Sequence, residues 1–244
     1  MTAVAVIGAA GRMGRATVDA VEAAGDLTLS ASIGRNDDLV AGLEGADVAV
    51  VMTGPEGVDD IVATCVEQGV HAVVGTTGWT GPGLAKVRAA LEKSPSTGVL
   101  LAPNFALGAV LLMRFAAEAA KHFESVEVVE LHHPNKADAP SGTARHTAEQ
   151  IAAARREAGV GPSPDATTAS LDGARGADVE GVRVHSVRLR GLVAHEEVLL
   201  GGPGEQLTIR HDSFDRISFM PGVLLAVRQI ANRPGLVQGL EHYL

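Results

Sequence analysis

A polar segment between a predicted strand and a predicted helix, residues 130–144, carries the residue types best suited to chemistry. Its two histidines can donate or relay protons near neutral pH, and its lysine adds a positive charge that can attract an anion. The helix that follows is capped by Ser141, and the N–H groups of its first turn lack intrahelical partners, so they can bind a carboxylate or phosphate. We therefore predict acid–base chemistry on an anionic substrate, carried by His132, His133, Lys136, Gly142 and Thr143.

Two other uses of this segment are open. A metal site is disfavoured because no cysteine or carboxylate lies at ligand spacing from the histidines, and His195-Glu196-Glu197 does not continue to the second histidine of H-E-x-x-H. A polar strand end at the surface, with Ser141 serving only as a helix cap, is the alternative without a function. We expect no metal and favour the anion site, because two histidines, a lysine and an anion-ready helix start seldom meet by chance.

The first predicted strand is joined to the first predicted helix by a glycine-rich loop, Gly8-Ala9-Ala10-Gly11-Arg12-Met13-Gly14. Its spacing is G-x-x-G-x-x-G, a variant of the G-x-G-x-x-G of dinucleotide-binding folds. Glycines let a backbone approach a pyrophosphate closely, and the helix behind them offers N–H groups and the positive end of its dipole. An ordinary strand-to-helix turn is the alternative, but the place of the loop after the first strand of an α/β alternation favours a dinucleotide site.

Two further loops follow later predicted strands, where open α/β sheets bind their ligands. They are Gly75-Thr76-Thr77-Gly78 and Ala102-Pro103-Asn104-Phe105. Both could lay backbone groups against a nicotinamide, with ordinary turn chemistry as the alternative. The second predicted strand ends in Ile33-Gly34-Arg35, without the carboxylate that often holds the ribose hydroxyls of NAD, and an arginine can meet the 2′-phosphate of NADP. We therefore predict that Arg35 gives a preference for NADPH, with NADH as a second cofactor that the site can accept.

Two kinds of architecture must position these candidate sites. Over the first hundred residues strands and helices alternate, which predicts parallel pairing with right-handed crossovers. Strands are expected at residues 4–7, 27–33, 47–52, 70–74 and 99–102, and helices at residues 12–24, 58–68 and 84–91. This pattern predicts an α/β fold, a Rossmann-type doubly wound parallel sheet.

After Phe105 the pattern changes to that of an α+β domain. Helices are expected at residues 107–122 and 141–158, a long loop at 159–181, and strands at 126–131, 183–189, 196–200 and 206–211. The close spacing of the last strands favours antiparallel pairing. A final helix at 216–231 is expected to return to the first domain. We thus predict a dinucleotide-binding domain from residues 1–105 plus 215–244, and a substrate-binding domain from residues 106–214.

Composition narrows the classes of partner. The chain carries a net charge of −9, which argues against nucleic acid because a phosphate backbone needs a basic surface. No stretch is long and apolar enough to cross a bilayer, and the N-terminus lacks the pattern of a secretory signal. The single cysteine, Cys65, is expected in the core and fits a reducing compartment. We therefore predict a cytoplasmic protein without nucleic-acid or membrane partners.

On these motifs the chain resembles the 4-hydroxy-tetrahydrodipicolinate reductase (dihydrodipicolinate reductase) family over nearly its whole length. The most specific motif is E-L-H-H-x-x-K-x-D-A-P-S-G-T-A at residues 130–144, supported by the glycine loop, the two later loops and a late Val187-Arg188 strand. The resemblance implies reduction of 4-hydroxy-tetrahydrodipicolinate to tetrahydrodipicolinate by NADPH or NADH, with loss of water, in lysine and diaminopimelate biosynthesis. It also implies a homotetramer assembled through the sheets of the second domain, which is then an oligomerisation domain as well.

The resemblance implies a role for each candidate residue. His132 matches the general acid/base and Lys136 the catalytic lysine. The residues that match contacts to the substrate carboxylates are His133, Gly142 and Thr143. The residues that match cofactor contacts are Gly8, Ala9, Ala10, Gly11, Arg12, Met13, Gly75, Thr76, Thr77, Ala102, Pro103, Asn104 and Phe105.

The chain differs from the family's sequence pattern at one place, and two other functions are open. Where the family has Asp-Phe-Thr at the end of the third strand, this chain has Val51-Met52-Thr53-Gly54, so we expect an aromatic contact near the cofactor to be lost. A related two-domain reductase of another dicarboxylate, or a non-catalytic NADP-binding sensor on the same fold, would share most of these features. The pair His132 and Lys136 favours an enzyme, since a sensor need not keep both. Arg188 can either reach the substrate or pair with a neighbouring strand.

Overall fold

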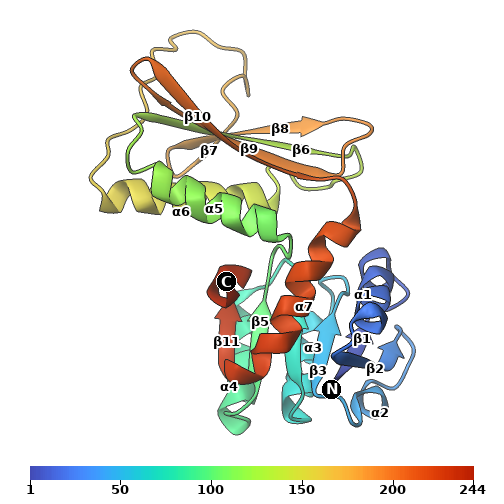
Figure 1. Cartoon of the computed structure of the whole chain (residues 1–244). Helices are drawn as coiled ribbons and strands as arrows, with labels where there is room; N and C mark the ends of the chain where they lie inside the picture. The colour runs from blue at the N-terminus through green and yellow to red at the C-terminus, as the bar shows by residue number, and fades with distance from the viewer. The chain divides into compact units, whose positions relative to one another are not determined.

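The computed structural model describes residues 1–244 and divides into two compact units (Figure 1). The first unit comprises Met1–Ala106 and Arg216–Leu244, and the second comprises Leu107–Asp215. The chain therefore leaves the first unit once and returns to it at its end. None of the helices has the length and apolar character needed to span a bilayer.

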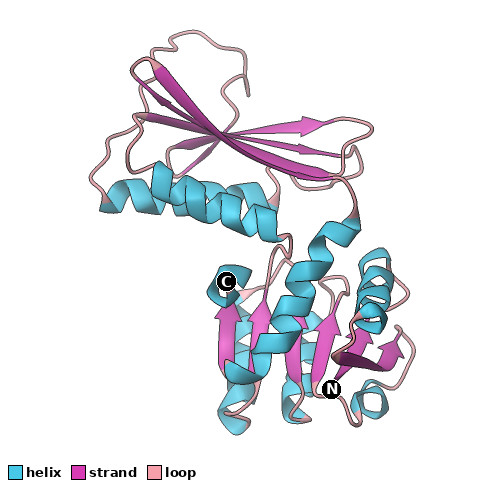
Figure 2. Cartoon of the chain, viewed as in Figure 1, coloured by secondary structure: helices cyan, strands magenta, loops and turns pink.

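The first unit is built on a six-stranded sheet in which every strand is parallel to its neighbours. The strand order is β11-β5-β4-β3-β1-β2, and helices lie on both faces of the sheet (Figure 2). The strands are β1 (Thr2–Ile7), β2 (Leu27–Ile33), β3 (Val48–Val51), β4 (His71–Val74), β5 (Gly98–Leu101) and β11 (Gly235–Gln238). The helices are α1 (Arg12–Ala23), α2 (Leu39–Leu43), α3 (Val58–Glu67), α4 (Gly81–Lys93) and α7 (Met220–Gln229). The predicted doubly wound α/β fold is confirmed.

Helices on both faces explain why the central strands are continuous apolar runs. Strands β3 and β5 are buried along their whole length. Side chains of α3 and α4, among them Val62 and Val87, pack against the sheet in one core cluster. Cys65 is fully buried in this cluster, as predicted, and burial raises the pKa of its thiol to about 12. The strand order reverses between β1 and β3, which is the point where open α/β sheets bind ligands at the carboxyl ends of their strands.

Helix α2 and strand β11 of the first unit are not predicted by the sequence, and one predicted helix is divided. Helix α2 and strand β11 are too short to show a hydrophobic period, at five and four residues. The helix predicted at 216–231 consists of a 3-10 turn (Arg216–Phe219), α7 and a second 3-10 turn (Ile230–Asn232). Pro221 lies in the first turn of α7, where its missing backbone N–H is tolerated. This helix packs against α1, so its predicted return to the first part of the chain is confirmed.

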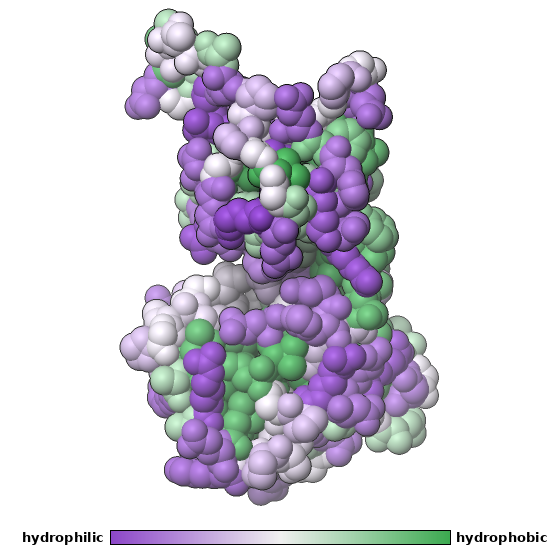
Figure 3. All heavy atoms as spheres, turned by 90° about the vertical axis from the view of Figure 1, so that its left-hand side faces the viewer, coloured by the Kyte–Doolittle hydropathy of each residue, from purple (hydrophilic) through white to green (hydrophobic).

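Strand β11 forms one edge of this sheet, and apolar surface gathers on that side of the unit. Hydrophilic side chains dominate the face shown in Figure 3, with a green apolar patch on the first unit, on the side where β11 lies in Figure 1. Leu236 and Val237 of β11 are only partly buried. The edge strand is therefore less well covered than the strands inside the sheet.

The second unit is a five-stranded mixed sheet with two helices, α5 (Leu107–Ala119) and α6 (Gly142–Glu157), on one face (Figure 1). The strand order is β10-β9-β6-β8-β7. The strands are β6 (Ser125–His132), β7 (Ala177–Val179), β8 (Val182–Arg188), β9 (Ala194–Gly202) and β10 (Glu205–Ser213). The prediction of an α+β architecture is confirmed.

One expectation for this sheet holds in part, and another is wrong. The close spacing of the strands at 183–189, 196–200 and 206–211 predicts antiparallel pairing, which holds for β9 with β10. It does not hold for β8 with β9, because β6 lies between them. Strand β8 is instead parallel to β6, because the chain between them crosses over through α6. Strand β7 lies inside segment 159–181, which is predicted to be a loop. Its three residues form a strand because they pair with β8, and their own pattern is too short to predict it.

Alternation along β6 directs its side chains to opposite faces of the sheet. Val126, Val128 and Glu130 are buried on the face that α5 and α6 cover, whereas Glu127 and Val129 on the other face are half-buried. Strand β6 therefore carries an acidic side chain into the layer between sheet and helices, directly before the polar segment.

Candidate active site

The glycine loop after β1 holds backbone segments close together. Gly8 has a φ of +83°, and a Cβ atom there would lie 2.6 Å from the carbonyl oxygen of Met52. A Cβ atom on Gly14 would lie 2.1 Å from the carbonyl oxygen of Gly8. Both positions therefore require glycine. Helix α1 begins against the loop with Gly11 as its N-cap, and no side chain caps its N–H groups, so an anion can reach them.

A cavity of about 540 Å³ lies beside this loop, at the carboxyl ends of β1, β2 and β3. Gly8 and Gly11 line it from the loop, and Arg35 lines it from the end of β2. Two acids follow Arg35, but both bind the backbone. Asp37 accepts a hydrogen bond from the backbone N–H of Gly34 at 2.7 Å. Asp38 accepts hydrogen bonds from two backbone N–H groups at the start of α2. The exposed Arg35 is the basic residue of the lining.

Some predicted cofactor residues lie outside this cavity. These are Ala9, Arg12, Met13, Gly75, Thr76, Thr77, Ala102, Pro103, Asn104 and Phe105, whereas Ala10 lines it. The loops after β4 and β5 nevertheless lie at the same edge of the sheet as the cavity, because β3, β4 and β5 are parallel neighbours. Thr76 Oγ1 donates to the carbonyl oxygen of Thr53 at 2.9 Å, and Trp79 Nε1 donates to that of Thr76 at 2.9 Å. The first bond ties the loop after β4 to the loop after β3, and the second lies within the loop after β4.

Met52 occupies the place where the resemblance leads us to expect an aromatic residue. A Cβ atom on Gly75 would lie 2.7 Å from Sδ of Met52 and 3.1 Å from Cε2 of Phe105. The thioether therefore packs against the backbone of Gly75, next to the aromatic ring of Phe105. A flexible methionine side chain fills the space between these loops in place of a ring.

Glu130, near the end of β6, is the centre of the candidate site in the second unit. Its side chain is fully buried. Its Oε2 lies 2.5 Å from Nδ1 of His132 and 2.8 Å from Nη1 of Arg188. Its Oε1 accepts from Nη2 of Arg188 at 2.8 Å and from the backbone N–H of Ser141 at 3.1 Å. One carboxylate thus joins the end of β6, the end of β8 and the start of α6.

The carboxyl group of Glu130 is ionised at neutral pH. Burial by itself raises its pKa, but hydrogen bonds from His132, Arg188 and Ser186 outweigh burial and hold the pKa at about 2. An ionised carboxylate only accepts hydrogen bonds, so Nδ1 of His132 carries the proton of their contact. The neutral imidazole then has its lone pair on Nε2, which is the form that a general base needs.

Lys136 and the first turn of α6 share the carboxylate of Asp138. Nζ of Lys136 lies 2.6 Å from Oδ1 of Asp138, and the backbone N–H of Gly142 donates to Oδ2 at 3.1 Å. Burial raises the pKa of Asp138, but the hydrogen bond and charge of Lys136 bring it below its usual value. Asp138 therefore binds two of the groups that the sequence predicts for an anionic substrate.

The other predicted substrate residues lie in the same segment. Ser141 caps α6, because its Oγ accepts a hydrogen bond from the N–H of Ala144 at 3.1 Å, so the predicted cap is confirmed. Thr143 lies in the first turn of this helix and His133 directly after β6, and both are half-buried. The second unit thus brings the proposed acid–base and anion-binding groups into one stretch of chain.

A second buried acid lies opposite Glu130 in the sheet. Glu196 of β9 pairs in register with Glu130 and is 5% exposed. Burial raises the pKa of Glu196 to about 7, and this effect is larger than that of a hydrogen bond from Thr147, which lowers the pKa. Its Oε1 has no hydrogen-bond partner. Of these two neighbouring carboxyl groups, Glu130 carries the charge and Glu196 keeps its proton up to about neutral pH.

Three acids of this site have no role in the sequence-based prediction: Glu130, Asp138 and Glu196. Arg188, for which the sequence leaves two uses open, is the cross-strand partner of Glu130 and also donates to the carbonyl oxygen of Asp138 at 2.6 Å. The sequence signal that could have identified Glu130 is strand alternation, which places Glu130 and His132 on the same face of β6.

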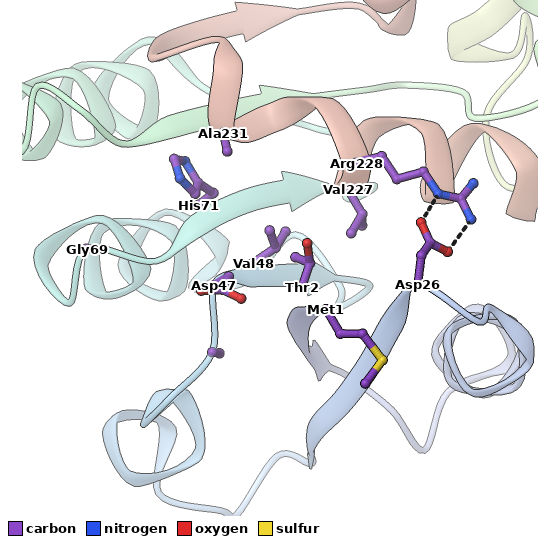
Figure 4. A pocket seen from close by; sticks show the side chains of 11 residues that line it. Met1, Thr2, Asp26, Asp47, Val48, Gly69, His71, Val227, Arg228 and Ala231 are labelled. Carbon is purple, nitrogen blue, oxygen red and sulfur yellow. Dashed lines mark hydrogen bonds and ion pairs between the residues drawn. The ribbon is translucent and has the colours of Figure 1, made fainter.

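A second cavity, of about 620 Å³, lies at the opposite end of the first sheet, at the amino ends of β1, β3 and β4 (Figure 4). Its charged side chains and its histidine are engaged within the chain. Arg228 binds Asp26 at 2.8 and 2.9 Å, Asp47 accepts a backbone N–H at 2.7 Å, and Nδ1 of His71 accepts another at 2.9 Å. Open α/β sheets bind their ligands at the other end of the strands. We therefore assign this cavity a structural role.

Comparison with known proteins covers almost the whole chain. Residues 2–105 match the family model described as dihydrodipicolinate reductase, N-terminus, and residues 108–244 match dihydrodipicolinate reductase, C-terminus. The 4-hydroxy-tetrahydrodipicolinate reductase of Streptomyces griseus subsp. griseus is 63% identical over 242 residues, which is 99% of this chain and 97% of that protein. The reductase of Corynebacterium diphtheriae is 60% identical and covers 99% of this chain and 98% of its own length.

Solved structures agree with these matches. The dipicolinate-bound dihydrodipicolinate reductase from Paenisporosarcina sp. TG-14 has a TM-score of 0.87 and 36% identity, and the similarity covers 100% of both chains. An amine dehydrogenase from Mycobacterium smegmatis has a TM-score of 0.65 at 14% identity, covering 97% of this chain and 94% of its own, so it shares the fold alone. From the two family models and the relatives of nearly equal length, the chain belongs to the dihydrodipicolinate reductase family.

Proposed function

We propose that this chain reduces 4-hydroxy-tetrahydrodipicolinate to tetrahydrodipicolinate with NADPH or NADH, with loss of water, in diaminopimelate and lysine biosynthesis. The observation that carries the proposal is the arrangement within residues 130–144, where a histidine bound to an ionised glutamate precedes a lysine and the start of a helix. A ring with two carboxylates matches such a cluster of positive and N–H donor groups. The similarity to reductases of this name along the full chain supports the same reaction.

The first unit would hold the cofactor. The cavity of about 540 Å³, the uncapped helix start and the missing side chains of Gly8 and Gly11 fit a dinucleotide whose pyrophosphate lies on the loop. Arg35 would meet the 2′-phosphate through charge-assisted hydrogen bonds, which is our reason for proposing a preference for NADPH. The nicotinamide ring, when bound, supplies the hydride.

We assign proton transfer to His132 and stabilisation of negative charge to Lys136. With Nδ1 bound to Glu130, Nε2 of His132 is the ring atom that can give or take a proton at the substrate. The ammonium group of Lys136 and the N–H groups of Gly142 and Thr143 would receive a substrate carboxylate in place of Asp138, with His133 as a further contact.

The proposal includes a homotetramer that forms through the sheet of the second unit. The face of this sheet turned away from α5 and α6 carries four half-buried apolar side chains: Val129, Leu131, Val187 and Leu199. Apolar side chains gathered on such a face favour association with further copies. Light scattering on the purified protein should give about four times the chain mass of 25.0 kDa, whereas a monomer would contradict this part of the proposal. A cytoplasmic location stays a prediction, with the buried thiol of Cys65 in its favour.

An absorbance assay of NADPH tests the reaction, with dihydrodipicolinate synthase supplying its fresh product. We expect NADPH oxidation only when that product is present, and competitive inhibition by dipicolinate. Binding of NADPH without oxidation would favour a non-catalytic sensor. Oxidation with another dicarboxylate or imino acid, but not with this product, would favour a related reductase.

A further inference from the structure

The carboxylate of Glu130 binds His132 and Ser141 in addition to Arg188, the residue with which it forms an ion pair between strands. His132 lies two residues along the same face of β6, with Nδ1 2.5 Å from Oε2. Both oxygens bind the guanidinium of Arg188 at 2.8 Å, and the N–H of Ser141 adds a bond at 3.1 Å. The donors come from three segments of the chain, and the side chain is fully buried. Rotation of this carboxylate would break several contacts at once, so its orientation is fixed.

A fixed carboxylate decides how the ring of His132 is protonated. The bidentate Arg188 keeps the charge on Glu130, and a charged carboxylate can only accept the Nδ1–H of the ring. A neutral amide in the same place could instead donate to Nδ1 and move the ring proton to Nε2. Where a histidine transfers a proton, the wrong tautomer removes most of the rate even when the geometry is intact.

We propose that Glu130 is a positioning residue of the reductase, which holds His132 as the Nδ1–H tautomer so that Nε2 is the atom that transfers the proton. This inference rests on the proposed function, because it assumes that His132 transfers a proton in that reaction. Lys136 is held by a different acid, Asp138. The effect of Glu130 is therefore expected on proton transfer and not on the charge supplied by the lysine.

Glu127 provides a matched control on the same strand. It lies three residues before Glu130 and on the opposite face of the sheet. It also joins a histidine and an arginine, because Nε2 of His185 lies 2.7 Å from its Oε2 and Arg175 forms an ion pair with its Oε1. Glu127→Gln thus removes a similar charge from a similar cluster that does not include His132.

The first measurement is the tautomer of His132 in the wild-type protein with isotope-labelled histidine. Long-range proton–nitrogen NMR spectra at about pH 9, where an ordinary imidazole is neutral, distinguish the two tautomers. The ring signals that disappear in His132→Gln belong to this residue. We expect a protonated Nδ1 and an unprotonated Nε2. A neutral ring protonated at Nε2 would overturn the proposal, and this test does not require any Glu130 variant to fold.

The second measurement compares kcat, KM and the tautomer in Glu130→Gln, Glu130→Asp and Glu127→Gln. In Glu130→Gln we expect the Nε2–H tautomer and a kcat about 100-fold or more below wild type, with the KM for NADPH changed less than about twofold. Glu130→Asp keeps the charge and should recover part of the lost kcat. Glu127→Gln should keep kcat within about twofold, since its cluster lies on the other face and does not include His132, provided that light scattering gives the variant the same mass as wild type.

Three outcomes separate positioning from a structural role or from a wrong function. Equal losses of kcat in Glu130→Gln and Glu127→Gln would overturn the proposal, because a general loss of structure would then explain both. A loss of kcat with an unchanged His132 tautomer would also overturn it. If the wild-type protein does not oxidise NADPH with the substrate, the proposed function fails, while a tautomer that still depends on Glu130 supports the positioning of His132.

Discussion

Replacing Glu196 with glutamine should stabilise the protein at neutral and higher pH. The side chain is 5% exposed, and its Oε1 has no hydrogen-bond partner. Its neighbour across the strands, Glu130, keeps a full negative charge. Ionising a second carboxyl group here costs free energy, whereas a glutamine amide of the same shape carries no charge.

The magnitude follows from the pKa of Glu196, which burial raises from 4.5 to about 7. This rise of about 2.5 units, at about 1.36 kcal/mol per unit, corresponds to about 3 kcal/mol. Between these two pKa values the unfolded chain has lost a proton that the folded chain keeps, so the free energy of unfolding falls as pH rises. Above about pH 7 Glu196 is ionised in both states, and the whole penalty is present.

Urea unfolding at one protein concentration measures the effect. We expect Glu196→Gln and wild type to differ by less than about 1 kcal/mol at about pH 5, and the variant to be more stable by about 3 kcal/mol at about pH 8. Glu197→Gln is the control, because Glu197 lies on the opposite face of β9 and binds Arg210 at 2.7 Å. An exposed ion pair of this kind contributes about 1 kcal/mol or less. A difference between Glu196→Gln and wild type that does not grow with pH would refute the inference that Glu196 is neutral when folded.

Four further predictions concern the site and one buried cation. His132→Ala and Lys136→Ala should each lower kcat by about 100- to 10,000-fold in steady-state assays and leave NADPH binding nearly unchanged, and wild-type turnover would reject their roles. Arg35→Ala should raise the KM for NADPH about tenfold or more and that for NADH much less, so an unchanged ratio of the two would reject the cofactor preference. Asp138→Asn should strengthen competitive inhibition by dipicolinate, because the competing carboxylate loses its charge, and weaker inhibition would contradict that competition. Arg155→Met should lower the free energy of unfolding by about 3 kcal/mol or more, since this buried guanidinium donates to four backbone carbonyl oxygens, and a stability equal to wild type would show that water replaces them.

Features of the fold that depend on neighbouring residues could be predicted from the sequence. The glycine loop, the apolar central strands and the Ser141 cap each depend on residues within one turn or one strand. The same holds for the buried Cys65, which lies on the apolar side of α3. These patterns identify the parallel sheet and the polar segment of residues 130–144.

Contacts between distant segments could not be predicted in this way. The parallel pairing of β6 with β8 depends on the path of the chain through α6, and β7 exists only because β8 lies beside it. The partners of Glu130 come from its own strand, from Ser141 and from Arg188, which is 58 residues away in the sequence. Glu196 did have a local signal, because it alternates in phase with two buried residues of β9, but that pattern does not reveal which acid lies opposite.

Isotope transfer tests most directly whether this chain moves a hydride from a reduced nicotinamide cofactor in forming tetrahydrodipicolinate. NADPH that carries deuterium at the reactive carbon of the nicotinamide is mixed with the protein and with fresh product of dihydrodipicolinate synthase. Mass spectrometry of the tetrahydrodipicolinate then reports whether the hydride has moved. We predict one deuterium in each product molecule with the wild-type protein and almost no product with His132→Ala over the same time. Product without deuterium, or NADPH that binds and is never oxidised, would contradict this hydride transfer.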